Sequence, residues 1–467
     1  MSSEIPAYII AQNRKEYGPD YERIKWADPG KIISAENERD AILKGLSGKT
    51  NTGYAGSKID VTNLSPGCIS CGEGSWSCLF INGKCNCRCF YCPTDQDDIG
   101  EPMTNTVPFP ETGDYIDYIN HFKFKGVSIS GGEPLLTLER TLKFISEVRN
   151  GTDPSTYIWM YTNGSLSNRE ILQKLQKAGL DELRFDIGAV GYNISKAAEA
   201  VPFIKNVTVE IPAVPEDFEV MKRKLKEMKE AGIKFLNLHQ MRLTPYNFEK
   251  LTARNYTFLH GEKVTVLESE LTALKLIEYS KTENTGLDIN YCSFIYKNRF
   301  QRSAARKRSA GYVMNSLSDL TEKGLIRSLY ITGNGERLEK IEEGLSAQDS
   351  LREFHRFDKN TGRIYLSAKV LKFTDTENIS LHINYSEPKI LPSVSYTNPF
   401  KQIKLNDERN LFVEKVRFLP ETVLSGNEIP AFTGWISGGN NMVNIESEKA
   451  ENIARGEFLG RGLQKYF

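Results

Sequence analysis

The chain has 467 residues, of which 39% are hydrophobic, enough for a large buried core in one domain with appendages or in two domains. Lys plus Arg and Asp plus Glu number 60 each, so the overall charge favours neither nucleic acid nor a membrane surface as a partner. The first thirty residues lack the apolar segment of a signal peptide, and no run of about eighteen apolar residues occurs. We therefore expect no transmembrane helix and a cytoplasmic location.

Seven apolar segments predict buried strands after an N-terminal extension, residues 1–66, in which we expect irregular structure with one short helix. The predicted strands are residues 78–82, 126–130, 156–162, 182–187, 206–212, 233–240 and 287–292. Apolar residues at helical spacing fall between them, as from Leu138 to Val148. Ser167 and Glu170 predict a capping box for a helix that ends at Gly179.

The spacing of these strands predicts the fold class. Between residues 126 and 233 the strand starts recur about every 24 to 30 residues, the size of a βα unit. Such a series forms a parallel sheet, either curled into a full or partial (β/α) barrel or open and doubly wound. We predict an α/β fold with a full or partial barrel of parallel strands. Functional side chains are then expected at the carboxyl ends of the strands.

The pattern changes from about residue 310 onward. Residues 363–373 and 379–385 alternate apolar and polar side chains, which predicts half-exposed antiparallel strands and a C-terminal β-rich module. The predicted division is thus an N-terminal extension (1–66), a barrel domain with a Cys-rich segment at its start (67–309) and the β-rich module (310–467).

The cysteines are concentrated in one part of the chain. Seven of the eight fall between residues 68 and 92, and Cys85, Cys87, Cys89 and Cys92 share the loop after the first predicted strand. Thiols two residues apart on a loop are poor disulfide partners, and a disulfide framework is typical of small secreted domains. The cluster therefore indicates a metal centre.

Two motifs together resemble the signature of radical S-adenosylmethionine (radical SAM) enzymes. Cys85-x3-Cys89-x2-Cys92 follows the first strand, and Gly131-Gly132-Glu133-Pro134 follows the next. The resemblance covers roughly residues 78–295. Within the superfamily, residues 209–217 resemble a strand end of glycyl-radical activases, but with Glu210 where those often carry Arg. Three further stretches, 235–247, 291–308 and 320–333, are similar to proteins related to pyruvate formate-lyase activating enzyme.

The resemblance implies a chemistry and its cofactors. Cys85, Cys89 and Cys92 would ligate three irons of a [4Fe–4S] cluster, and the open fourth iron would bind the amino and carboxylate groups of S-adenosylmethionine. An electron from a flavodoxin- or ferredoxin-type partner would cleave the cofactor to methionine and a 5′-deoxyadenosyl radical, which abstracts hydrogen from a substrate C–H bond. The enzyme would be oxygen-sensitive and its substrate a peptide, a protein or a small molecule. No catalytic side chain is assigned.

The same resemblance implies contacts to S-adenosylmethionine. The glycine pair would approach its methionine end, Glu133 would pair with its ammonium and Tyr91 would pack on its adenine. Asn163 and Glu210 are candidates for ribose and sulfonium contacts. The cofactor-binding set is Tyr91, Gly131, Gly132, Glu133, Pro134, Asn163 and Glu210.

Other interpretations of the same residues exist. Cys85, Cys87, Cys89 and Cys92 could hold one structural zinc ion, although zinc would not explain the Gly-Gly-Glu-Pro motif. Cys87 would otherwise be a spectator or an alternative ligand. The corresponding alternative function is a non-catalytic zinc or iron–sulfur protein that serves partner binding or electron transfer. His239 is either a core residue or a substrate contact.

Cys68-x2-Cys71-x6-Cys78 predicts a second metal site, for zinc or an auxiliary iron–sulfur cluster, with structural packing or a redox disulfide as alternatives. At about 3.3 Å per extended residue, Cys78 and Cys85 should lie roughly 20 Å apart, so one cluster cannot use both. The fourth ligand is open: Cys292, a histidine, solvent or substrate could supply it, although the strand end that carries Cys292 is expected nearer the first cluster. The basic run 297–308 is either a solvated helix face or an anion site for a carboxylate or phosphate.

Overall fold

The computed structural model describes residues 5–438 and 444–466, which divide into two compact units. The first unit runs up to Gln301 and includes the chain from Gly460 onward, and the second runs from Arg302 to Leu459. The three-part division predicted from the sequence, with boundaries after residues 66 and 309, stays a prediction.

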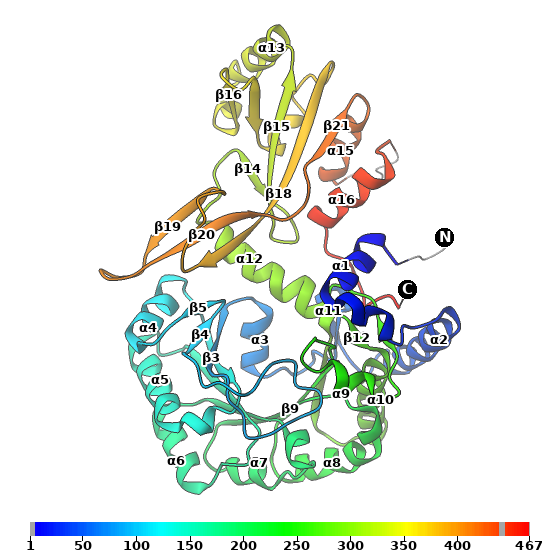
Figure 1. Cartoon of the computed structure of the whole chain (residues 1–467), viewed down its shortest axis with the longest axis vertical. Helices are drawn as coiled ribbons and strands as arrows, with labels where there is room; N and C mark the ends of the chain where they lie inside the picture. Colours follow the sequence, from blue (N-terminus) through cyan, green and yellow to red (C-terminus); the bar gives the residue numbers. More distant parts are fainter. Residues whose placement is uncertain (1–4, 439–443, 467) are drawn as a thin grey trace. The chain divides into compact units, whose positions relative to one another are not determined.

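The first unit is built on a sheet of seven neighbouring parallel strands, confirming the predicted α/β class (Figure 1). In spatial order these are β13 (Asp288–Cys292), β10 (Phe235–His239), β9 (Asn206–Pro212), β8 (Glu182–Phe185), β7 (Tyr157–Thr162), β6 (Gly126–Gly131) and β3 (Trp76–Asn82). Short antiparallel strands extend both edges: β2 (Lys58–Ile59) and β1 (Thr52–Gly53) beside β13, and β4 (Met103–Thr104) and β5 (Val107–Pro108) beside β3. Within the described residues β1 and β5 remain edges, so the barrel is partial.

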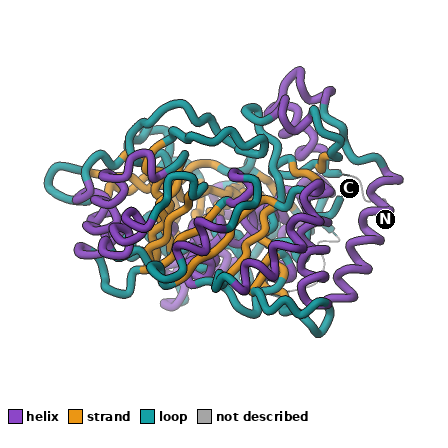
Figure 2. Tube along the Cα trace, turned by 90° about the horizontal axis from the view of Figure 1, so that it is seen from below, coloured by secondary structure: helices purple, strands orange, loops and turns teal. Residues whose placement is uncertain are grey.

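Helices that follow the strands cover the outside of this sheet, as the arc of helices in Figure 1 and the outer purple segments in Figure 2 show. They are α4 (Thr112–His121), α5 (Leu138–Gly151), α6 (Arg169–Ala178), α7 (Ser195–Ala200), α8 (Phe218–Glu230) and α10 (Leu267–Thr282). Each turns an apolar stripe inward; α8, for example, buries Met221, Leu225 and Met228. Shorter elements are α9 (Phe248–Thr252), β11 (Phe258–Leu259), β12 (Thr265–Val266) and α11 (Phe294–Tyr296).

The start of α6 differs from the prediction. Its N-cap is Asn168, whose side chain accepts a hydrogen bond from the backbone N–H of Ile171, so the predicted Ser167–Glu170 capping box is wrong. Asn and Ser are about equally good N-caps, and Asn168, the residue directly before α6, is the N-cap here. The predicted helix end is confirmed, because Gly179 adopts a left-handed φ of 93° directly after α6.

The N-terminal segment is more helical than expected. It forms α1 (Ala7–Tyr17), α2 (Pro29–Leu46) and α3 (Pro66–Gly72), so the expectation of one short helix is wrong. Helix α2 begins at the side-chain cap of Asp28 and packs against α10. Charged residues interrupt its apolar stripe, which weakens the helical pattern in the sequence. Helix α3 packs against β6 and β7.

The second unit contains the predicted β-rich module. Its antiparallel sheet has the order β16 (His355–Asp358), β17 (Arg363–Leu366), β15 (Ile326–Gly333), β18 (Ile379–Leu391), β20 (Asn410–Arg417), β19 (Phe400–Lys404), with β14 (Ser318–Leu320) beside β15 and β21 (Thr422–Ser425) beside β18. Its helices are α12 (Arg302–Ala310), α13 (Gly335–Ser346), α14 (Ala368–Leu371), α15 (Glu428–Ile436) and α16 (Ser447–Glu457). The strand predicted over 363–373 stops halfway, because the Ser367 side chain caps α14.

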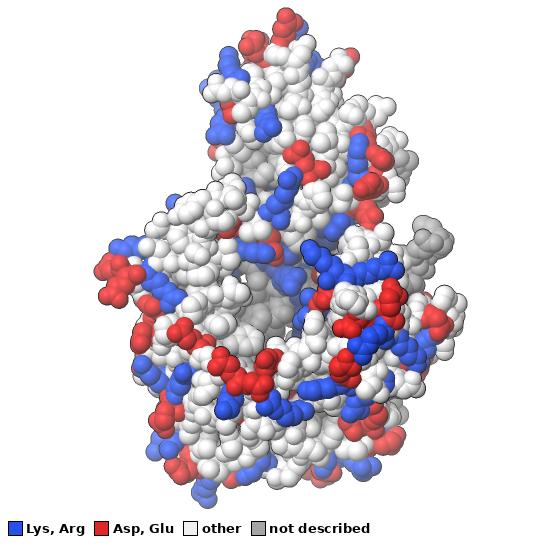
Figure 3. All heavy atoms as spheres, viewed as in Figure 1, with Lys and Arg blue, Asp and Glu red and all other residues white. Residues whose placement is uncertain are grey.

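The surface charge agrees with the equal numbers of basic and acidic residues in the sequence. Basic and acidic side chains are interspersed on the face drawn in Figure 3. No helix within residues 5–438 and 444–466 is long and apolar enough to span a membrane.

The end of β6 lies directly against the loop that follows β3. The backbone N–H of Gly132 donates to the carbonyl of Asn82 at 2.9 Å, and that of Glu133 donates to the carbonyl of Lys84 at 2.8 Å. A Cβ on Gly132 would overlap the Lys84 carbonyl, and Gly131 adopts a φ of 122° that disfavours other residues. The glycine pair is therefore required by the fold at this position.

We expect Gly132→Ala to lower the free energy of unfolding by about 2 kcal/mol or more, because the overlapping atoms are backbone and the loop must move. Gly113→Ala, inside α4 and with no atom within 4 Å of the new Cβ, is the matched control and should leave stability unchanged or slightly higher. Urea denaturation of the two variants measures both effects. Equal stability of the two would contradict this account of the glycine pair.

Candidate functional site

A cavity of about 410 Å³ lies where the parallel strands end at their carboxyl termini. Four thiols from the loop after β3 line it, with residues at the ends of β6 to β10. Its lining includes Cys85, Cys87, Cys89, Cys92, Tyr91, Gly131, Gly132, Asn163, Arg184, Asp186, Glu210, His239 and Lys297. The predicted cluster ligands and five of the seven predicted cofactor contacts therefore share one cavity; Glu133 and Pro134 lie outside its lining.

The cysteine loop is positioned by neighbouring strand ends. The backbone N–H of Cys85 donates to the carbonyl of Gln96 at 3.1 Å. The amide of Asn163, directly after β7, donates to Cys85 Sγ at 3.7 Å and to Asn86 Oδ1 at 2.8 Å. Burial raises the pKa of Cys87 to about 11 and that of Cys89 to about 12, which favours the protonated thiol at both positions.

Glu133 is fully buried and joins the ends of β6 and β7. Its carboxylate accepts hydrogen bonds from the backbone N–H of Leu135 at 3.0 Å, the hydroxyl of Thr162 at 2.8 Å and the backbone N–H of Asn163 at 2.7 Å. Burial raises its pKa, and these hydrogen bonds oppose that shift. In this structure its carboxylate holds the strand ends; its role toward the cofactor ammonium stays a prediction.

Tyr91 lines the cavity and is held by a carboxylate that the sequence interpretation missed. Its hydroxyl donates to Asp186 Oδ1 at 2.9 Å, and its ring meets that of Phe90 edge-on. Burial raises the pKa of Asp186 to about 6, against the opposing effect of the Tyr91 hydrogen bond. Asp186 follows β8 directly, as Asn163 follows β7. The position of Asp186 near the end of a predicted strand was the sequence signal that could have identified it as a site residue.

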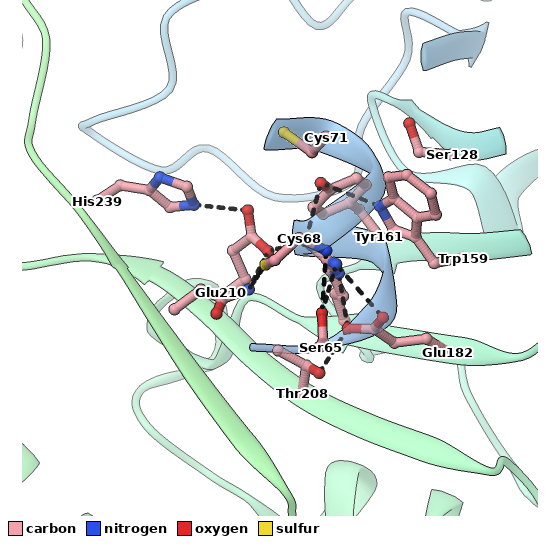
Figure 4. Close-up of polar contacts among 12 residues, drawn as sticks. Ser65, Cys68, Cys71, Ser128, Trp159, Tyr161, Glu182, Thr208, Glu210 and His239 are labelled. Carbon is pink, nitrogen blue, oxygen red and sulfur yellow. Dashed lines mark hydrogen bonds and ion pairs between the residues drawn. The ribbon is translucent and has the colours of Figure 1, made fainter. Parts of the chain in front are cut away.

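Glu210 belongs to a buried ion network across the strands (Figure 4). Arg184 Nη1 donates to Glu210 Oε2 at 2.6 Å, and Arg184 Nε donates to Glu182 Oε1 at 2.9 Å. His239 Nε2 lies 2.6 Å from Glu210 Oε1. Although burial opposes it, the charges of Arg184 and His239 hold the pKa of Glu210 well below its usual range. Glu210 lines the cavity, and its predicted cofactor contact stays a prediction.

The basic run 297–308 is not simply a solvated helix face. The ammonium of Lys297 lies 2.9 Å from Nδ1 of His239, and both residues line the cavity. Arg299 donates to the carbonyls of Arg461 and Gly462. Arg306, in the second unit, is buried and pairs with Glu387 at 2.7 Å. Lys297 is thus a cavity residue, in line with the anion-site alternative.

The upstream cysteines lie at a second, inner cavity of about 250 Å³. Helix α3 carries Cys68 and Cys71 to it (Figure 4). Cys292, at the end of β13, lines the same cavity, whereas Cys78 is not in its lining. The side-chain amide of Asn237 donates to Cys68 Sγ at 3.3 Å, and that of Gln301 donates to Cys71 Sγ at 2.7 Å.

Cys292 is the thiol of this cavity whose pKa is lowered, whereas burial raises the pKa of Cys68 and Cys71. Burial opposes its ionisation, yet the nearby ammoniums of Lys58 and Lys297 lower its pKa to about 6. Among residues 5–438 and 444–466, no three His, Cys, Asp or Glu side chains form a ready metal site. Both ligand sets, Cys85, Cys89 and Cys92 for the cluster and Cys68, Cys71 and Cys78 for a second metal, therefore stay predictions.

Comparison with known proteins identifies the family. Residues 79–234 match the family model of the radical SAM superfamily. "Putative glycyl-radical enzyme activating enzyme MJ0021" of Methanocaldococcus jannaschii is 30% identical over 311 residues, 64% of this chain and 81% of that protein. "Probable GTP 3',8-cyclase" of Methanococcus aeolicus is 29% identical over 165 residues, 34% of this chain and 48% of that protein. The chain belongs to the radical SAM superfamily, which confirms the resemblance carried by its two motifs.

Membership defines the class of protein: it is a radical SAM enzyme, and its cofactors are a [4Fe–4S] cluster and S-adenosylmethionine. The chemistry of the donors fits, because Cys85, Cys89 and Cys92 present three thiols to one cavity. Solved structures resemble the chain only loosely. Streptococcus suis SuiB bound to precursor peptide SuiA gives a TM-score of 0.34 at 12% identity, covering 56% of this chain and 62% of that one.

We expect Glu133→Ala to lower the free energy of unfolding by about 2–4 kcal/mol, because two buried N–H groups and one hydroxyl lose their acceptor. Glu133→Gln, which keeps one acceptor oxygen, should lose less, and Glu101→Ala at an exposed position is the neutral control. Chemical denaturation ranks the three variants. If Glu133→Ala were as stable as the control, Glu133 would not hold the strand ends.

Proposed function

We propose that the protein reductively cleaves S-adenosylmethionine at a [4Fe–4S] cluster held by Cys85, Cys89 and Cys92, and removes hydrogen from a substrate C–H bond. One observation carries the proposal: these three thiols line the same cavity as the glycine pair at the carboxyl ends of β6 to β10. Three cysteines leave one iron of a cubane cluster without a protein ligand, which is where an exchangeable cofactor can bind.

The chain's own residues hold the cysteine loop in place and are proposed to bind and orient S-adenosylmethionine. The glycine pair fixes where the cysteine loop leaves β3, and Asn163 holds Cys85 from the next strand end. Tyr91, braced by Asp186, offers an aromatic face to the adenine, and Glu133 is proposed for the cofactor ammonium. Cys87, the fourth thiol of the loop, is the spectator in this assignment.

When bound, the two cofactors supply a one-electron cleavage in which S-adenosylmethionine, one electron and a substrate C–H group give methionine, 5′-deoxyadenosine and a substrate radical. We assign the electron to a flavodoxin- or ferredoxin-type partner. The name of the Methanocaldococcus jannaschii relative supports a peptide or protein as the substrate. In such a substrate, we propose that a Cα–H bond of the peptide or protein supplies the hydrogen atom.

The experiment is anaerobic reconstitution followed by reduction with dithionite in the presence of S-adenosylmethionine. We expect the wild-type protein to form 5′-deoxyadenosine, and single alanine variants of Cys85, Cys89 and Cys92 to lose this product below about 1% of wild type, because each loss removes a cluster ligand. Chromatography with mass spectrometry quantifies the product.

Cys87→Ala is the matched control, since it removes a thiol from the same loop and should retain the activity. Activity retained by Cys85→Ala but lost by Cys87→Ala would overturn the ligand assignment. No product from a fully iron-loaded wild-type protein would overturn the proposed reaction.

A further inference from the structure

The inner cavity contains a buried ammonium without a carboxylate partner. Lys58 on β2 is 1% exposed and lines this cavity. Within the described parts of the chain its Nζ makes no hydrogen bond or carboxylate ion pair, and its one aromatic contact is with the ring of Tyr296, 4.6 Å from Nζ to the centroid. Burying an ammonium without a carboxylate partner is costly. A thiolate at Cys292 can neutralise only one of the two ammoniums, those of Lys58 and Lys297, that lower its pKa.

The rest of the cavity wall is also suited to negative charge. Lys297 adds a second ammonium, whereas Arg184 is paired with Glu182 and Glu210. Glu210 is the one carboxylate that the described residues contribute to the lining. Glu210 is already bound by Arg184 and His239, so it does not neutralise Lys58. The hydroxyl of Tyr296 lies buried in the same lining and has no hydrogen-bond partner among residues 5–438 and 444–466. It provides a further donor that faces the same space.

The inner cavity adjoins the cofactor cavity. Tyr161, Arg184, Glu210, His239 and Lys297 line both. Its volume of about 250 Å³ holds on the order of eight water molecules at about 30 Å³ each, enough for a small acidic group but too little for S-adenosylmethionine. A group bound there would place the rest of its molecule at the wall shared with the cofactor cavity.

We propose that the inner cavity binds an oxyanion of the substrate, a carboxylate or a phosphate, with the ammoniums of Lys58 and Lys297 as its donors. The identification of this ligand with the substrate rests on the proposed function, whereas anion binding itself does not. Charge-assisted hydrogen bonds to two ammoniums are the strong interactions expected for such a group.

A metal ion on Cys68, Cys71 and Cys292 is the competing use of this cavity. Two of those thiols already accept hydrogen bonds, from Asn237 and Gln301. The ammonium of Lys58 beside them would repel a divalent cation in a low-dielectric interior. The arrangement favours an anion.

Cys292 on the cavity wall provides the readout. In the anaerobically reconstituted full chain, alkylation of Cys292 by anionic iodoacetate and by neutral iodoacetamide is measured by peptide mass spectrometry. Both reagents react with the thiolate, so its fraction cancels in the ratio of the iodoacetate rate to the iodoacetamide rate. The ratio then reports how strongly the cavity attracts an anion. We expect Lys58→Met to lower this ratio at least fivefold, and Lys297→Met to lower it also.

Lys174→Met, an exposed lysine on α6, is the matched control and should leave the ratio unchanged. Inorganic phosphate or acetate should protect Cys292 and raise the melting temperature of the wild type but not of Lys58→Met, and the stronger protector identifies the oxyanion. Lys58→Met should fold and melt close to wild type, because it removes a buried ammonium that has no carboxylate partner among the described residues, and Cys292 can then stay protonated.

The proposal would be overturned if the iodoacetate-to-iodoacetamide rate ratio were unaffected by Lys58→Met and Lys297→Met, or if Cys292 were not labelled and phosphate gave no thermal shift. It would also be overturned if S-adenosylmethionine alone protected Cys292 as completely as phosphate. Zinc or extra iron that is lost in Cys71→Ala would assign the cavity to a metal instead. Loss of S-adenosylmethionine cleavage alone would leave these readouts intact. The two proposals therefore fail separately.

Discussion

The close packing of two backbone segments, the glycine pair after β6 and the first residues after β3, is the constraint on which the candidate site depends. Backbone hydrogen bonds from Gly132 and Glu133 fix Asn82 and Lys84, so the cysteine loop leaves the sheet in one direction. The buried carboxylate of Glu133 then ties β6 to β7, and through Asn163 to Cys85. Three consecutive strand ends are thereby held together before any cofactor binds.

A second constraint is electrostatic and lies deeper in the barrel. The Arg184–Glu210–His239 network stands at the wall shared by the two cavities and is satisfied within the protein. Because its charges are already paired, it is suited to position neighbouring groups rather than to bind ions. Lys58, by contrast, has no carboxylate partner in the described part of the chain. The paired charges of the network therefore shape the barrel interior, whereas Lys58 is the charge that we propose for ligand binding.

Much of the first unit could be predicted from the sequence, because strand length, helical spacing and the two motifs are local patterns. The cluster loop and the glycine pair were found for that reason. Cys292 was only one of several candidates for the fourth ligand, because its place in one cavity with Cys68 and Cys71 depends on α3 packing against β6 and β7, which no local pattern encodes. Lys58 gives no signal in the sequence either, because its burial and its lack of a carboxylate are tertiary properties. Helix α2 was missed because charges interrupt its apolar stripe.

The account's central claim is that a cluster on Cys85, Cys89 and Cys92 has one iron open to S-adenosylmethionine inside this cavity. Electron paramagnetic resonance of the reduced, reconstituted protein tests it most directly, because a molecule that binds iron changes the signal of the cluster. The account predicts that adding S-adenosylmethionine shifts the spectrum of the wild type, and that the alanine variant of all three cysteines gives no such cluster signal. A wild-type spectrum that is identical with and without S-adenosylmethionine would contradict it.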